Sequence, residues 1–153
     1  MLEHFERDVL TTKRILDMDL THVRAFTDAV QRKDLEAMLS HMTEEIVLET
    51  PFFAEPVRGK AALRTVVGAL LAIADSFDSQ ELMQGPSHVA WSYVVWIGAE
   101  RLDGMDYCLL DETRKIARMK VLWRPLPALA AVQRRLDGGT SKVEREAPRG
   151  TVW

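Results

Sequence analysis

The chain contains a single cysteine, Cys108, and only four histidines among its 153 residues. One cysteine excludes an internal disulfide, and without a CxxC or paired Cys/His spacing a structural zinc site is excluded as well. The histidines form no HxH or HxxxH pair and no glycine-rich nucleotide loop occurs, so we expect neither a metal nor another cofactor. Sparse cysteine favours a reducing, cytoplasmic setting.

Long apolar runs and concentrated charge are also absent. The longest apolar run, residues 66–74, is broken by Gly68 and is too short to span a bilayer. The N-terminus carries acidic residues early and lacks the apolar core of a signal peptide. The formal net charge is -3, the pI is near 5.8, and no dense Lys/Arg cluster alternates with aromatic residues. We therefore expect a soluble protein that binds neither a membrane nor nucleic acid.

The first half of the chain has helical periodicity. A length of 153 residues with 47% hydrophobic content fits one domain with a substantial core. Apolar spacing predicts a helix over 21–32, with Thr21 as its N-cap, and a second over 35–42, with Asp34 as its N-cap. A loop then leads to the longest helix, whose apolar stripe should lie across a sheet and comprises Leu63, Val66, Val67, Leu70 and Leu71.

The second half has strand periodicity. Together with an earlier strand over 44–50, we predict strands over 76–84, 89–100, 105–113 and 116–124. Breaks are predicted at 85–86, at Asp103-Gly104 and at 111–115, and the last two are spaced for hairpins. Helices followed by antiparallel strands indicate an α+β domain with about three helices on one sheet face. A short helix over 128–136 should complete it.

These elements divide the chain into three parts. Residues 1–18 are a weakly helical extension, residues 19–136 form the domain, and residues 137–153 are rich in glycine and charge and are expected to be a flexible tail.

One carboxylate interrupts an otherwise apolar strand face. Asp106 lies in the predicted hairpin, and side-chain alternation gives it apolar neighbours: Cys108 and Leu110 on its own strand, and Met119, Val121 and Trp123 on the next. A buried acid must be hydrogen-bonded, neutralised or used. Asp106 is therefore our candidate catalytic group, and the alternative is a satisfied structural carboxyl.

Several short motifs occur in the order found in a known superfamily. They are Lys-Asp-Leu-Glu-Ala-Met at 33–38, Glu-Thr-Pro at 49–51, Glu-Pro-Val-Arg-Gly at 55–59 followed by Ala-Ala-Leu, the Asp106 strand, and Lys-Ile at 115–116. Over about residues 22–136 the chain resembles the nuclear transport factor 2-like superfamily, in its ketosteroid isomerase and SnoaL-like branch. The resemblance implies a cystatin-like α+β barrel: a curved antiparallel sheet forms a cone around an apolar pocket, helices pack on its concave face, and many members are dimers.

The resemblance also assigns residues to the pocket. The resemblance places Asp106 where the isomerases keep a buried, protonated aspartic acid that donates a hydrogen bond to the substrate oxyanion. Thr50 falls at the general base and Phe26 at the oxyanion tyrosine, and neither side chain can replace those groups. Classical ketosteroid isomerase activity is therefore not expected. Met119 and Trp123 fall at pocket-lining positions.

Other candidates follow from spacing. His22 shares a helix face with Phe26, so a dyad with Asp106 is conceivable, although an ordinary helix-start histidine is the commoner case. We expect further pocket-lining side chains at Phe52, Phe53, Trp91, Tyr93 and Cys108. For Phe52 and Phe53 the alternative is simple core packing. Cys108 has no adjacent His or Lys to form its thiolate, so it is interpreted as a small apolar wall residue.

The opposite sheet face also carries apolar residues. Trp96, Tyr107, Leu109 and Leu122 fall on outward positions, and a homodimer through this outer sheet face would cover them. The alternative is a helix or tail folded over the surface.

We therefore interpret the chain as a SnoaL-like cone that binds a small, apolar, cyclic, carbonyl-bearing compound. As an enzyme it would be a cofactor-free isomerase, cyclase or dehydratase working through Asp106. The alternatives are a non-catalytic binding protein and a dimeric protein-interaction module of the same fold.

Overall fold

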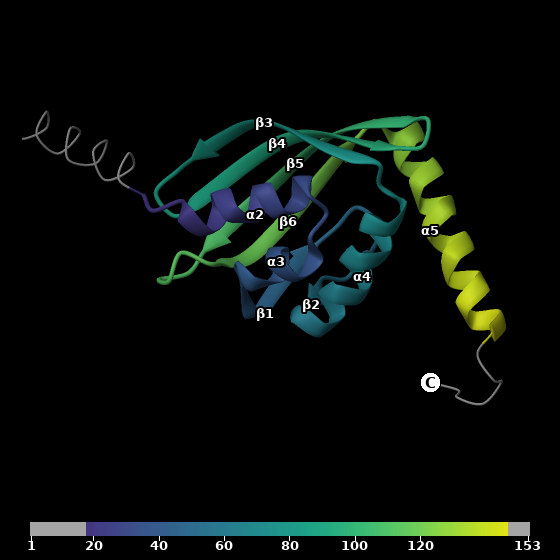
Figure 1. The fold of residues 1–153 in the computed structure, drawn as a ribbon, viewed down its shortest axis with the longest axis horizontal. Coiled ribbons are helices and arrows are strands. Elements are labelled where there is room, and N and C mark those ends of the chain that lie inside the picture. The colour runs from purple at the N-terminus through teal and green to yellow at the C-terminus, as the bar shows by residue number, and fades with distance from the viewer. Residues whose placement is uncertain (1–17, 147–153) are drawn as a thin grey trace, which may run out of the picture.

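The structure is a computed structural model. It describes the backbone of residues 18–146 and the burial of the side chains of residues 18–138. The described helices are α2 (Thr21–Gln31), α3 (Leu35–Ser40), α4 (Lys60–Ile73) and α5 (Leu126–Glu146). The strands are β1 (Met42–Glu49), β2 (Val57–Arg58), β3 (Ser76–Gln84), β4 (His88–Ile97), β5 (Glu100–Leu110) and β6 (Ile116–Arg124). Figure 1 shows α2, α3 and α4 over one face of the sheet and α5 at one end. The predicted α+β class is confirmed.

All six strands join one curved sheet that does not close, in the order β2-β1-β6-β5-β4-β3. Strands β3 to β6 form consecutive antiparallel pairs, as predicted, but β1 pairs with β6 in parallel. The sheet is therefore mixed, because β1 joins beside the last strand of the meander without a hairpin between them. The register shifts once in each of the β1–β6, β3–β4 and β5–β6 pairs, and such irregularities bend strands.

Helices α2 and α3 have different N-terminal caps. Asp34 caps α3 as predicted, since its Oδ1 accepts a hydrogen bond from the Ala37 backbone N–H at 3.0 Å. The predicted Thr21 cap is wrong. Leu20 occupies the N-cap position of α2, and the Thr21 N–H instead donates to Asp19 Oδ1 at 2.9 Å.

The turn between β4 and β5 lies earlier than predicted. It falls at Gly98, whose φ of 62° suits glycine, and β5 runs without a break through Asp103 and Gly104. Asp-Gly is a common turn pair, which is why the sequence pattern suggested a hairpin there. Gly104 instead lies opposite Tyr93 in the β4–β5 ladder, where its lack of a side chain leaves room for the Tyr93 ring.

The core lies between the sheet and α2, α3 and α4. Val23, Phe26 and Val30 of α2 are buried. On α4 only Leu63 and Leu71 of the predicted stripe are buried, and the remaining three stripe residues are only half-buried. Those three, Val66, Val67 and Leu70, border a cavity.

Helix α5 is longer than the predicted 128–136 segment. It buries Ala128 and Val132 and contacts β5 and β6. It continues to Glu146, so the first ten residues of the segment expected to be a flexible tail are helical. Residues 147–153, like the expected extension up to residue 17, lie outside the described part of the chain.

Candidate functional site

A cavity of about 470 Å³ lies between the sheet, α4, α5 and the segment after β1. Its wall is mostly apolar and includes residues from every layer of the fold. Eight predicted site residues border it: Phe26, Thr50, Phe52, Phe53, Tyr93, Asp106, Met119 and Trp123. A mainly apolar cavity with a few convergent polar groups is the usual form of a small-molecule site.

Asp106 is held inside this cavity by a chain of hydrogen bonds. The Tyr93 hydroxyl donates to Asp106 Oδ1 at 2.8 Å, and the Trp123 indole N–H donates to the Tyr93 hydroxyl oxygen at 2.7 Å. An indole nitrogen can only donate, so the Tyr93 oxygen accepts from Trp123 and its own proton points to Asp106. The Trp123–Tyr93–Asp106 chain thus has one direction, and it ends on a single carboxyl oxygen.

Three adjacent strands supply this chain. Tyr93 of β4 pairs with Gly104 of β5, which pairs in turn with Trp123 of β6. Because Gly104 has no side chain, the Tyr93 and Trp123 rings approach each other above it. Asp106 follows two residues later on β5, so its side chain points to the same sheet face. The sheet register therefore sets the geometry of the acid.

Burial controls the protonation of this group. Asp106 is 5% exposed, and burial raises its pKa to about 7, with the Tyr93 hydrogen bond opposing that rise. Burial, and then the neighbouring Asp106 charge, hold the pKa of Tyr93 well above its ordinary value. The Asp106 carboxyl can therefore be either neutral or charged near neutral pH, while Tyr93 stays a phenol.

Two predicted wall residues lie in the core behind the cavity. The Trp91 ring packs against Phe26 and Tyr93, and its indole N–H donates to Ser79 Oγ at 2.7 Å. Cys108 is buried opposite Met119, and burial, together with the Asp106 charge, raises the pKa of its thiol well above the ordinary value. Neither borders the cavity, and Cys108 is held as a neutral thiol.

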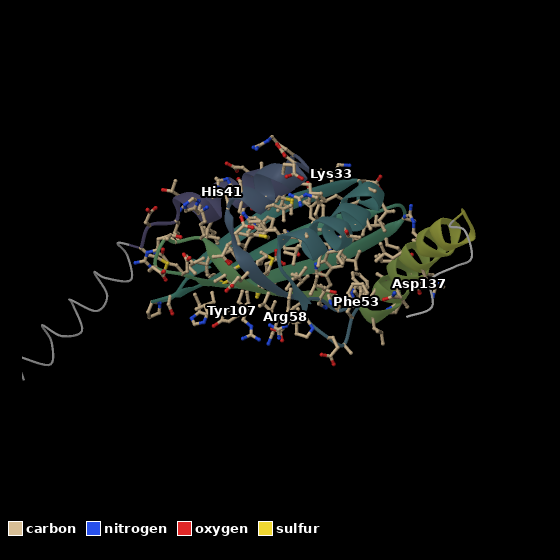
Figure 2. The ribbon with its side chains drawn as sticks, turned by 90° about the horizontal axis from the view of Figure 1, so that it is seen from below. Lys33, His41, Phe53, Arg58, Tyr107 and Asp137 are labelled. Carbon is tan, nitrogen blue, oxygen red and sulfur yellow. The ribbon has the colours of Figure 1, made fainter. Side chains whose placement is uncertain are left out.

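His22 and Asp106 do not form the dyad that the sequence suggested as one interpretation. His22 Nδ1 lies 3.0 Å from His41 Nδ1, and His22 does not border the cavity. Burial, followed by the charge of His22 and of Lys115, lowers the pKa of His41. A neutral His41 can accept a hydrogen bond from His22, so the pair is a local contact between α2 and the end of α3. Figure 2 shows His41 on the helical side of the molecule.

Thr50 and Phe26, which the resemblance assigns to the isomerase base and tyrosine, have side chains that cannot transfer a proton near neutral pH. Thr50 borders the cavity, and its hydroxyl oxygen accepts from the Phe52 backbone N–H at 3.0 Å. Phe26 presents its ring edge-on to Trp91, with centroids 6.2 Å apart. Asp106 is the one buried carboxyl among the residues that the structure describes.

Sequence reasoning missed part of the cavity wall. Gln133, Leu136 and Asp137 of α5 also border the cavity, and Gln133 Nε2 donates to Asp137 Oδ1 at 2.9 Å. The i, i+4 spacing of Gln133 and Asp137 puts them on one helix face, which the sequence does show. Where that face points depends on how α5 packs, and no local pattern reveals it.

The outer sheet face carries a group of exposed apolar side chains. We call this group the outer apolar strip; it consists of Trp96, Met105, Tyr107 and Leu122, which are 36–53% exposed. Tyr107 stacks on His88, with ring centroids 5.1 Å apart. Figure 2 shows Tyr107 and Arg58 pointing away from the helices. The predicted outward positions of Trp96, Tyr107 and Leu122 are thus exposed, whereas Leu109 is half-buried.

Two further features can be stated for the described residues alone. They contain no group of three or more His, Cys, Asp or Glu side chains placed to hold a metal ion. Over the same part of the chain, no helix has the length and apolar content needed to cross a bilayer.

Comparison by sequence identifies one family. The model of the SnoaL-like domain matches residues 23–119, which is more than half of the chain. The match covers α2 to β5 and part of β6, and so includes Tyr93 and Asp106. It stops before Trp123 and before α5. No curated protein matches the chain by sequence.

Solved structures share the fold at low identity. A steroid delta-isomerase from Pseudomonas aeruginosa is 16% identical, with a TM-score of 0.73 over 82% of this chain and 93% of its own. An uncharacterised cystatin-like protein from Silicibacter pomeroyi is 17% identical, with a TM-score of 0.73 over 81% and 88%. SalBIII, an epoxide hydrolase/cyclase-like enzyme of pyran ring formation in salinomycin, is 21% identical, with a TM-score of 0.60 over 74% and 92%. These likenesses show a cystatin-like, nuclear transport factor 2-like fold.

Proposed function

Because the chain belongs to the SnoaL-like domain family, we propose that its cavity binds a small, largely apolar, cyclic carbonyl compound on which Asp106 performs acid-base chemistry. The observation that carries this proposal is a buried carboxyl with a pKa of about 7 in an apolar cavity. A group poised near the working pH can both give and take a proton, which is what general acid-base catalysis needs.

The hydrogen bonds at Asp106 leave one oxygen for the ligand. Oδ1 accepts from Tyr93, so a proton on the neutral acid is carried by Oδ2. That proton can be donated to a ligand carbonyl oxygen, where it would stabilise an enolate. In the charged form, the same oxygen can take a proton from the carbon next to the carbonyl.

These roles suit an isomerase, a cyclase or a dehydratase. In an isomerisation, the carboxylate removes a proton from one carbon, the electron pair moves onto the carbonyl oxygen, and the same proton returns to a different carbon as the double bond shifts. Atoms and electrons balance without a cofactor. The names of two neighbours, a steroid delta-isomerase and an epoxide hydrolase/cyclase-like enzyme, support this range of chemistry.

A non-catalytic binding protein is the second candidate. It is favoured by Thr50 and Phe26, which border the cavity but provide no second proton-transfer group. A binder needs the cavity volume alone, whereas an enzyme needs Asp106 to change protonation during turnover.

We further propose that the outer apolar strip pairs with that of a second copy of the chain. The charges beside the strip already pair within the chain: Asp103 with Arg101 and Arg124 at 2.8 and 3.0 Å, and Glu49 with Arg118 and Lys120 at 3.7 Å each. A face whose charges are internally compensated suits another copy of itself better than a charged partner.

The cytoplasmic setting also remains a prediction.

A thermal-shift screen tests the ligand proposal. The purified chain and Asp106→Asn are heated with steroid, polyketide-like quinone and terpenoid compounds, because a ligand that binds only the folded state raises Tm by mass action. Asp78→Asn, an exposed change on β3, is the matched control.

A carbonyl compound that stabilises all three proteins is bound by the folded chain, because the amide of Asp106→Asn can still donate a hydrogen bond to the ligand carbonyl. That compound then enters turnover assays, where product formation lost in Asp106→Asn supports an enzyme. Equal stabilisation of all three proteins, without turnover, favours a binder. No stabilisation by any compound would contradict the proposal.

A further inference from the structure

The cavity has a deep end and a mouth, which the exposure of its wall residues distinguishes. Tyr93 and Asp106 are almost fully buried. Phe53 of the segment after β1, Thr65 of α4 and Asp137 of α5 also border the cavity but are exposed to solvent. Figure 2 shows Phe53 and Asp137 at the α5 end of the molecule. The mouth therefore lies beside α5, away from the acid.

Gln133 and Asp137 form a defined polar pair at this mouth. Gln133 Nε2 lies 2.9 Å from Asp137 Oδ1. A carboxylate can only accept hydrogen bonds, so the amide nitrogen of Gln133 must be the group that faces it. The Gln133 carbonyl oxygen and Asp137 Oδ2 are then two acceptors that can meet a ligand, and the second hydrogen on Gln133 Nε2 is the one donor that the pair still offers.

The two ends of the cavity thus have opposite hydrogen-bonding character. At the deep end, a neutral Asp106 offers a proton from Oδ2 because Oδ1 is engaged by Tyr93. At the mouth, Gln133 and Asp137 offer mainly acceptor atoms, among them a carboxylate oxygen. Between them the wall is apolar, with Val66, Val67 and Leu70 of α4 on one side. A ligand that satisfies both ends carries an acceptor at one end and a donor at the other.

We propose that Gln133 and Asp137 form a second polar subsite, which accepts a hydrogen bond from a hydroxyl or ammonium group at the far end of a ligand whose carbonyl oxygen meets Asp106. The inference rests on the proposed function, because it assumes that this cavity holds the ligand. It adds the substrate class, an apolar ring compound with a carbonyl at one end and a hydrogen-bond donor at the other, and it gives α5 a role in specificity.

Matched probes test the subsite. Testosterone carries a ketone at one end and a hydroxyl at the other, and androstenedione differs only in having a ketone in place of that hydroxyl. The 17β-amino analogue of testosterone provides an ammonium group at the same place. Binding of each to the full chain is measured by titration calorimetry, for wild type, Asp137→Ala and Gln133→Ala. Arg134→Ala, an exposed change on the same helix that does not border the cavity, is the control.

Wild type and Arg134→Ala should bind testosterone about five-fold more tightly than androstenedione, which is the size of one ordinary hydrogen bond. In Asp137→Ala the affinities for testosterone and androstenedione should become about equal. In Gln133→Ala the preference for testosterone should decrease. In both variants the affinity for androstenedione should change little. An amine that binds more tightly than the hydroxyl, and loses more in Asp137→Ala, identifies an ammonium as the preferred donor. An amine that binds no better identifies a hydroxyl.

Two results would overturn the inference and leave the proposed function standing. In the first, wild type binds testosterone and androstenedione equally tightly. In the second, the preference for testosterone persists in Asp137→Ala and Gln133→Ala. If wild type binds none of the three probes, both the inference and the proposed binding of cyclic carbonyl compounds are contradicted.

Discussion

Gly104 lies directly opposite Tyr93 in the β4–β5 ladder, and its lack of a side chain makes room for the Tyr93 ring. A Cβ at residue 104 would lie 2.6 Å from Cζ of Tyr93 and 3.0 Å from the indole nitrogen of Trp123. Both rings are fixed by the hydrogen bonds that lead to Asp106. The glycine therefore maintains the geometry of the candidate acid without touching it.

Replacing this glycine should disturb the acid. We expect Gly104→Ala to lower the free energy of unfolding by about 2–3 kcal/mol, because the new methyl group overlaps a ring that cannot move without breaking a buried hydrogen bond. Denaturant unfolding measures the change. Gly85→Ala is the control, since its Cβ would meet nothing closer than 3.6 Å and should be nearly neutral. Equal effects of the two changes would show that Gly104 does not provide this room.

The raised pKa of Asp106 predicts how stability depends on pH. Between the unfolded value of 3.8 and the folded value of about 7, the native protein holds a proton that the unfolded chain has released. The contribution of this group to stability is therefore complete below about pH 4 and is lost as pH rises towards 7. Asp106→Asn lacks this loss, so its stability relative to wild type should rise by up to about 4 kcal/mol over that range.

Unfolding of both proteins in denaturant at several pH values measures this difference. The exposed control Asp78→Asn should show no comparable trend. A difference between Asp106→Asn and wild type that stays constant from pH 4 to pH 8 would show that the carboxyl titrates normally.

Tyr93→Phe should raise the pKa of Asp106 further above 7. The Tyr93 hydroxyl donates to the carboxyl and favours its charged form, so its removal leaves burial unopposed. Carbon-detected NMR of the Asp106 carboxyl across pH gives the pKa directly and needs no ligand. A lower pKa in Tyr93→Phe would mean that the loss of the hydroxyl admits water to the site.

The outer apolar strip predicts a dimer. Leu122, at 53% exposed, lies in this strip, so Leu122→Lys should shift the mass in solution from twice 17.4 kDa towards 17.4 kDa. Leu126→Lys is the control, because Leu126 is more exposed but lies at the start of α5. Light scattering after size exclusion measures both. A monomeric wild type would rule out pairing through this face.

Periodicity sufficed to predict much of the sheet. The strands 76–84 and 116–124 were predicted to the residue, because alternation is strong there and turns flank both. Alternation also placed Asp106 and Trp123 on one face. The predicted break at Asp103-Gly104 was wrong because this pair is compatible with two structures. Asp-Gly is common in turns, but here the packing of Tyr93 requires a glycine inside the strand.

The remaining features of the site depend on tertiary contacts. Tyr93 was predicted only as a wall residue, since nothing local shows that its hydroxyl reaches an acid 13 positions away. Gln133 and Asp137 were missed because the path of α5 after β6 is set by the burial of Ala128 and Val132. The parallel pairing of β1 with β6 is likewise a property of the whole chain path.

The three half-buried residues of the α4 stripe contribute less to the free energy of unfolding than they would if they were fully buried. A helix that buried Val66, Val67 and Leu70 against a filled interior would hold the sheet more firmly, but it would leave no space for a ligand. Packing stability and cavity volume therefore place opposite demands on the same three side chains. Larger apolar residues at these positions should fill the cavity and raise Tm, and under the proposed function they should also abolish ligand binding.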